Sequence, residues 1–174
     1  NDAQAVGRFL SRFGIHRADL SPEEMTRVHV VIAAVATAIR EHNCVTLLPA
    51  LRSVLTFFVY ARMTPTGVSA LHQIARTIAK LGSATDVGFY LGRMNAWNET
   101  LVLPPYQMAV RHMANAVREY RRPEHIPALK LVLDRVRAYR STLGEGVGVL
   151  IADLEGAIQP LPSGGPSSPR SPRA

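Results

Sequence analysis

The sequence predicts an all-α protein, and three observations carry this prediction. Apolar residues recur every three or four positions, which places them on one face of a helix. Proline and glycine divide the 174 residues into segments of helical length. Aromatic residues make up only 6% of the chain, so we expect a mainly aliphatic core. The prediction is one compact domain of seven or eight helices at 1–158 and a flexible tail at 159–174.

The first two helices are predicted from start and stop signals. A short first helix is expected before Gly14. A second helix is expected to start at Ser21 and Pro22, because the serine can cap the helix and proline suits its first turn. Glu24 completes a capping box with Ser21. Asn43 tolerates the left-handed conformation and is expected to end this helix.

The remaining helices follow from the same kinds of signal. The segment 47–63 is predicted to be a helix with Pro49 in its first turn, although its β-branched and aromatic run could also form a strand. Thr64 and Pro65 open a fourth helix that ends at Gly82. No long internal repeat is apparent. The other expected helices span 84–97, 104–122, 124–143 and, most weakly, 147–158.

The chain is strongly basic, with a net charge of +7 and an isoelectric point of about 10.3. Eighteen of its 20 basic residues are arginine, whose planar guanidinium binds phosphate or carboxylate with two hydrogen bonds. Such a charge favours an anionic partner: nucleic acid, an acidic protein surface or an anionic membrane surface. A GC-rich genome would also favour arginine, alanine, valine and proline, and would explain the bias without any function.

Positive charge is densest at 111–140, whereas 141–169 carries three acidic residues and no basic residue. If the sixth and seventh predicted helices pack as a hairpin, their basic faces would form a groove for a phosphate backbone. The alternative is an ordinary solvated face that nearby acidic residues partly neutralise. The predicted groove consists of Arg111, Arg118, Arg121, Arg122, Lys130, Arg137 and Arg140.

No motif predicts catalysis or metal binding. The six histidines lack the helical spacing of a zinc site, and a single cysteine cannot form an intramolecular disulfide or a zinc knuckle. We therefore expect no enzyme activity, no metal and no cofactor. The chain also lacks a signal-peptide pattern and an apolar run of membrane-spanning length. The prediction is an intracellular protein, cytoplasmic, nuclear or within a virion, that does not insert into membranes.

Two further features suggest self-association. Gly88 and Gly92 lie one helical turn apart and give a smooth ridge that favours close helix contact. Trp97, Leu101 and Leu103 belong to an apolar, proline-bounded loop that either covers the core or docks on another subunit. The tail carries two Ser-Pro-Arg copies at 168–173 and is expected to serve mainly as a solubilising or assembly arm.

The leading hypothesis is a non-enzymatic structural or assembly protein that binds nucleic acid. An example of such a function is a coat or nucleocapsid-type subunit that self-associates along the nucleic acid, with RNA favoured over DNA. Contacts to the phosphate backbone would make the binding independent of sequence. The alternative is a helical adaptor or regulator that binds an acidic protein surface. An enzyme whose site the sequence does not reveal is a third class.

Overall fold

The computed structural model describes residues 5, 7–9, 20–60, 64–95, 104–140, 144 and 146–159. All regular structure in these residues is helical, which confirms the all-α prediction and excludes the strand considered within 47–63. The predicted tail lies outside the described residues beyond Gln159, and so do both ends of the predicted first helix. The helices are α2 (Pro22–Glu41), α3 (Leu48–Tyr60), α4 (Pro65–Leu81), α5 (Ala84–Asn95), α6 (Pro104–Tyr120), α7 (Ile126–Ala138) and α8 (Val147–Ile158), with 3₁₀ turns η1 (Val45–Leu47) and η3 (Pro123–His125).

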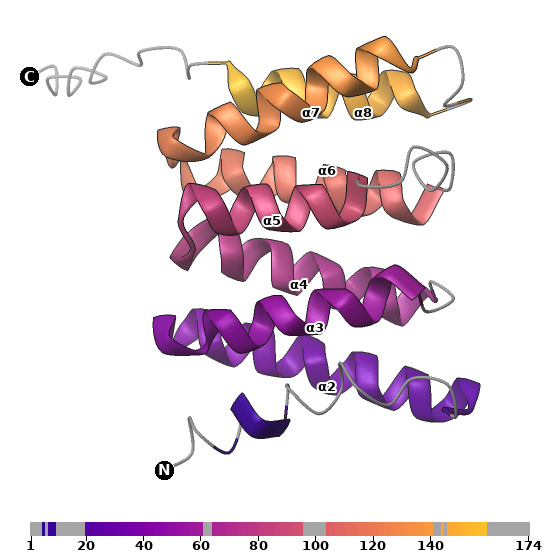
Figure 1. Ribbon diagram of the computed structural model, residues 1–174, viewed down its shortest axis with the longest axis vertical. Helices are drawn as coiled ribbons and strands as arrows, with labels where there is room; N and C mark the ends of the chain where they lie inside the picture. The colour runs from indigo at the N-terminus through magenta and orange to yellow at the C-terminus, as the bar shows by residue number, and fades with distance from the viewer. Residues whose placement is uncertain are drawn as a thin grey trace, which may run out of the picture.

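The helices lie across the long axis of the molecule and are stacked along it in two layers that pack face to face, and consecutive helices alternate between these layers (Figure 1). The first layer contains α2, α4, α6 and α8, each packed against the next, and the second layer contains α3, α5 and α7. Consecutive helices are antiparallel and lie in opposite layers, so the helices within one layer run in the same direction. The aliphatic core lies between the layers. Because the helices of one layer are parallel, side chains at corresponding turns of neighbouring helices can contact each other.

This arrangement is typical of helical-repeat proteins, in which each pair of helices contacts only the neighbouring pairs. The helices of the first layer begin roughly 40 residues apart, which is within the range of known helical repeats. A short sequence also recurs where the sequence predicts no long repeat. Leu48-Pro49-Ala50-Leu51 opens α3 and Ile126-Pro127-Ala128-Leu129 opens α7, in each case directly after a 3₁₀ turn.

Local signals place the ends of α2 and the start of α4 as predicted, whereas α7 ends at Ala138, before the predicted end at 143. The Ser21 hydroxyl accepts a hydrogen bond from the backbone amide of Glu24 at 3.3 Å, and the Glu24 carboxylate accepts one from the Ser21 amide at 2.8 Å. This is the predicted capping box of α2. Asn43 has a φ of 52°, in the left-handed region. The Thr64 hydroxyl caps α4 by accepting a hydrogen bond from the amide of Gly67 at 3.1 Å.

Tyr90 connects the two layers in the middle of the stack. Its side chain comes from α5 and is completely buried. The hydroxyl lies 3.3 Å from the carbonyl oxygen of Leu71 in α4 and 3.2 Å from that of Ala109 in α6. Burial raises the pKa of this phenol, so it remains a neutral donor at all ordinary pH values. One aromatic side chain thus holds three helices at a fixed height relative to one another.

Candidate nucleic-acid interface

Arginines in the first layer form a regular series of contacts between neighbouring helices. In each contact, an arginine of one helix donates to an acceptor on the next helix along the stack. The Arg40 guanidinium donates to the Gln73 side-chain oxygen at 2.8 Å, and the other two contacts are ion pairs. We call this series the arginine ladder; it comprises Arg40–Gln73 between α2 and α4, Arg76–Glu119 between α4 and α6, and Arg111–Asp153 between α6 and α8.

Two further arginines connect helices in the same way. Arg52 of α3 donates to the Asp86 carboxylate of α5 at 2.9 Å, and Arg137 of α7 donates to Glu155 of α8 at 2.6 Å. Burial alone would raise the pKa of Asp86, but hydrogen bonds from Ser83 and the nearby Arg52 guanidinium lower it. Asp86 is therefore held as a carboxylate against Arg52. Much of the arginine content thus joins helices to one another.

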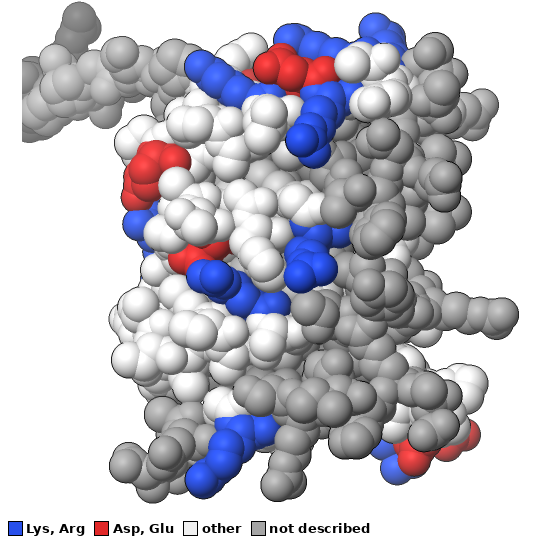
Figure 2. Space-filling model, viewed as in Figure 1, with Lys and Arg blue, Asp and Glu red and all other residues white. Residues whose placement is uncertain are grey.

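The groove predicted between α6 and α7 does not form as expected. In the described part of the chain, α8 packs against both helices, and they share little direct contact with each other. The acidic residues of α8 pair with Arg111 and Arg137. On the face that Figure 2 presents, basic side chains lie in separate groups, and several of them adjoin acidic side chains.

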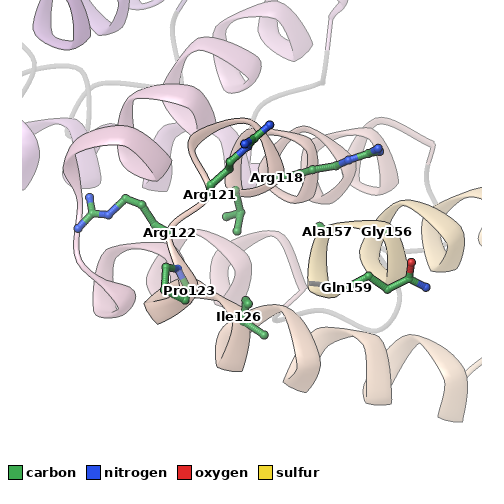
Figure 3. A pocket seen from close by; sticks show the side chains of 9 residues that line it. Arg118, Arg121, Arg122, Pro123, Ile126, Gly156, Ala157 and Gln159 are labelled. Atoms are coloured by element: carbon green, nitrogen blue, oxygen red, sulfur yellow. The ribbon is translucent and has the colours of Figure 1, made fainter. Parts of the chain in front are cut away.

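Three of the predicted groove residues nevertheless lie together, at the ends of α6 and α8. Arg118, Arg121 and Arg122 lie at one side of an open hollow of about 310 Å³ (Figure 3). We call it the C-terminal hollow; it is lined by Val117, Arg118, Arg121, Arg122, Pro123, Ile126, Gly156, Ala157 and Gln159.

The three arginines differ in their partners. Arg122 donates to the Glu124 carboxylate at 2.7 Å and to the carbonyl oxygen of Lys80 at 2.8 Å, and its side chain points away from the hollow (Figure 3). Arg118 and Arg121 are exposed, and neither forms an ion pair with any carboxylate that the structure describes. Two guanidinium groups are therefore available at the rim of the hollow.

The backbone at the end of α6 separates neighbouring arginines. Arg121 has a φ of 54°, a left-handed conformation that is uncommon for a residue with a side chain. This conformation ends α6 and directs Arg121 and Arg122 to different sides. The carbonyl ends of α6 and α8 both lie at the hollow, and their partial negative charges favour cations there. Helix stabilisation is therefore an ordinary structural role for Arg118 and Arg121.

Three other predicted groove residues lie on α7 or directly after it. Lys130 and Arg137 line a second hollow of about 400 Å³ between α7 and α8, together with the acidic Asp134 and Glu155. Arg140 is exposed just after α7. The structure thus groups Arg118 and Arg121 with the bonded Arg122, and it places Lys130 and Arg137 in a neighbouring surface of mixed charge.

The residues predicted for self-association are described only in part. Gly88 and Gly92 lie beside a small hollow of about 60 Å³, whose other wall is formed by α7. A Cβ atom at either glycine would meet nothing within 4 Å. Among the described residues, no helix therefore packs closely on this ridge, and its role between subunits stays a prediction. Trp97, Leu101 and Leu103 lie outside the described residues.

A pair of histidines beside the ladder was not singled out from the sequence. The Nδ1 atoms of His72 in α4 and His112 in α6 lie 3.2 Å apart, at hydrogen-bond distance. Burial, the other histidine and Arg111 lower the pKa of His112 to about 4. Burial, followed by Arg76 and Arg40, also lowers that of His72, although Glu119 opposes this effect. The sequence signal for this pair was the spacing of His72 and His112, which are 40 residues apart, about the spacing of neighbouring helices in the first layer.

Comparisons with protein-family models, curated proteins and solved structures found no match. Within the described ranges, no three histidine, cysteine, aspartate or glutamate side chains gather as metal ligands would. A search of the same residues found no helix with the length and apolar character needed to cross a membrane. The arrangement of the arginines is thus the main basis for a functional proposal.

Proposed function

We propose that this protein is a non-enzymatic structural or assembly protein that binds the phosphate backbone of nucleic acid at the C-terminal hollow. One observation carries the proposal. Arg118 and Arg121 are exposed without a described carboxylate partner, whereas the arginines of the ladder are bonded to the neighbouring helix. A guanidinium that no protein carboxylate neutralises can bind a phosphate without breaking an existing ion pair.

The net charge of +7 supports this reading, because it raises the local concentration of a polyanion around the whole molecule. Each phosphate that an arginine neutralises releases a counterion, so affinity should fall steeply as salt rises. In its more specific form, the proposal is a coat or nucleocapsid-like subunit that self-associates along RNA.

A second candidate is an adaptor that binds an acidic protein segment. The observation that favours it is the mainly apolar wall of the hollow, formed by Val117, Pro123, Ile126 and Ala157. A short peptide with an apolar side chain and a neighbouring carboxylate would match such a wall beside two arginines. Stacked helix pairs also serve as binding surfaces for extended segments in other repeat proteins.

The test is fluorescence anisotropy of a labelled single-stranded RNA over a salt series. We expect Arg118→Glu/Arg121→Glu to reduce the affinity at least about tenfold and to flatten the salt dependence by about two phosphate contacts. The control is Arg8→Glu/Arg27→Glu, which makes the same change of net charge at exposed positions near the opposite end of the stack. Circular dichroism establishes that both variants keep their helices.

Two results would contradict the proposal. If both double variants lose the same affinity, binding reflects net charge and not the C-terminal hollow. If the unmodified protein fails to bind RNA even at low salt, the adaptor becomes the leading function. Binding to an immobilised acidic peptide, lost in Arg118→Glu/Arg121→Glu, would then support that second candidate.

A further inference from the structure

We infer that the C-terminal hollow receives one unpaired nucleotide, so that the protein prefers single-stranded to double-stranded nucleic acid. This inference rests on the proposed function and names the form of nucleic acid that the site selects. Its basis is the combination of an apolar hollow with two guanidinium groups at its rim that pair with no described carboxylate. Charge alone would serve a duplex as well as a single strand.

The wall of the hollow has the chemistry to contact the face of a base. Val117 from α6 and Ala157 from α8 are almost fully buried beneath it, and Pro123 and Ile126 add apolar surface from the start of the α7 segment (Figure 3). None of the described residues that line the hollow is aromatic. A base would therefore pack on aliphatic groups and on an arginine plane, since guanidinium groups stack on bases.

The size of the hollow favours a single nucleotide. A volume of about 310 Å³ lies at the lower end of the range for small-molecule sites. A duplex keeps its bases stacked inside the helix, and inserting one would require unpairing and unstacking it. A single strand presents bases that are already unpaired, so only this form can use the wall and the arginines together.

The rim provides groups for the polar parts of a nucleotide. Arg118 of α6 and Arg121, which directly follows α6, both lie at the rim, where each can donate to a phosphate (Figure 3). Gly156 forms the α8 side of the hollow beside Arg118, and a Cβ added there would lie 3.8 Å from the Arg118 guanidinium, in ordinary van der Waals contact. Gln159 reaches the rim from the end of α8 and offers an amide that can donate to or accept from a base edge.

The experiment fills the hollow without removing a charge. In Gly156→Leu the new side chain would project from α8 into the hollow, and both arginines remain. Leucine forms helices better than glycine, so the variant is expected to fold at least as well. The matched control is Gly148→Leu on the same helix, which is exposed, lies outside the hollow and has no atom within 4 Å of its added Cβ. Thermal unfolding of both variants checks the fold.

Anisotropy is measured with one labelled RNA strand, alone and annealed to its complement, at equal salt. We expect the unmodified protein and Gly148→Leu to bind the single strand about tenfold more tightly than the duplex, the effect of burying one base face against aliphatic groups. Gly156→Leu should lose this preference, with an unchanged duplex affinity and an unchanged salt dependence.

Several outcomes would overturn the inference and remain distinguishable from one another. Equal affinity of the unmodified protein for both RNA forms, or an unchanged preference in Gly156→Leu, rejects the nucleotide site but leaves backbone binding intact. Failure to bind either RNA form rejects the proposed function as well. Failure with RNA but binding of an acidic peptide containing leucine, lost in Gly156→Leu, would assign the hollow to a protein segment.

Discussion

Two arginines of the same helix have opposite surroundings. Arg111 of α6 pairs with Asp153 of α8, whereas Arg118, two turns later on the same helix, lies beside Gly156 of α8. The two side chains share a face of α6, and the neighbouring helix alone makes the difference. Where that helix offers a carboxylate, the arginine joins two helices; where it offers glycine, the guanidinium stays available to solvent and ligands.

The comparison changes how an arginine-rich sequence should be interpreted. Genome composition and phosphate binding both explain the bias, but the ladder adds a third explanation, since Arg40, Arg76 and Arg111 join consecutive helices of one layer. The number of arginines is therefore a poor guide to function in this protein. Arg118 and Arg121, which pair with no described carboxylate and lie together at the C-terminal hollow, carry the functional proposal.

The largest expected effect is on the helix packing that positions both Arg111 and Arg118. Tyr90→Ala removes a fully buried aromatic side chain between three helices, so we expect the free energy of unfolding to fall by about 3–5 kcal/mol. Tyr90→Phe keeps the ring and loses only the hydroxyl contacts to Leu71 and Ala109, at a cost of about 1 kcal/mol. Urea denaturation measures both values. A loss below about 1 kcal/mol for the alanine variant would show that Tyr90 does not hold the layers together.

The next largest effect is the pH dependence of the free energy of unfolding, which arises from the two histidines beside the arginine ladder. The pKa of His112 is lowered from 6.5 to about 4, and that of His72 is also lowered. The neutral imidazoles are thus favoured in the folded state. The unfolded chain binds more protons between these pH values, so stability is fully present above about pH 6.5 and is lost as the pH falls towards 4. For His112 the loss is up to about 3 kcal/mol.

Urea denaturation at several pH values measures this dependence. His112→Gln removes one titrating group and should flatten the curve between pH 6.5 and 4, whatever its effect at neutral pH. His29 and His125 are buried, with lowered pKa values of the same sign, and they keep part of the slope. A variant curve parallel to that of the unmodified protein would show that His112 does not titrate in this range.

The sequence predicted features that depend on neighbouring residues. Ser21 and Thr64 cap the helices that they were expected to cap, because a cap needs only the first turn that follows it. The shared face of Arg111 and Arg118 also follows from helical geometry. The acidic character of 141–169 was evident, but not that Asp153 meets Arg111 while Gly156 meets Arg118. That relation depends on how α8 packs against α6, which local sequence signals do not specify.

The smallest effects compare the two arginines of α6 directly. Arg111→Gln breaks a partly exposed ion pair with Asp153, so we expect the free energy of unfolding to fall by about 0.5–1 kcal/mol. RNA affinity should stay nearly unchanged, because Arg111 is already neutralised. Arg118→Gln removes no described ion pair and should change stability by less than about 0.5 kcal/mol. It should nevertheless weaken RNA binding and lower the salt dependence by about one phosphate contact.

Urea denaturation and RNA anisotropy on the same two variants make this a crossed comparison. Because both substitutions remove one positive charge from the same face of α6, a general effect of net charge would weaken RNA binding equally in both. Equal weakening would therefore show that the ion pair with Asp153 does not withhold Arg111 from the ligand. If instead only Arg118→Gln weakens binding and only Arg111→Gln lowers stability, the residue that α8 places beside each arginine determines what that arginine does.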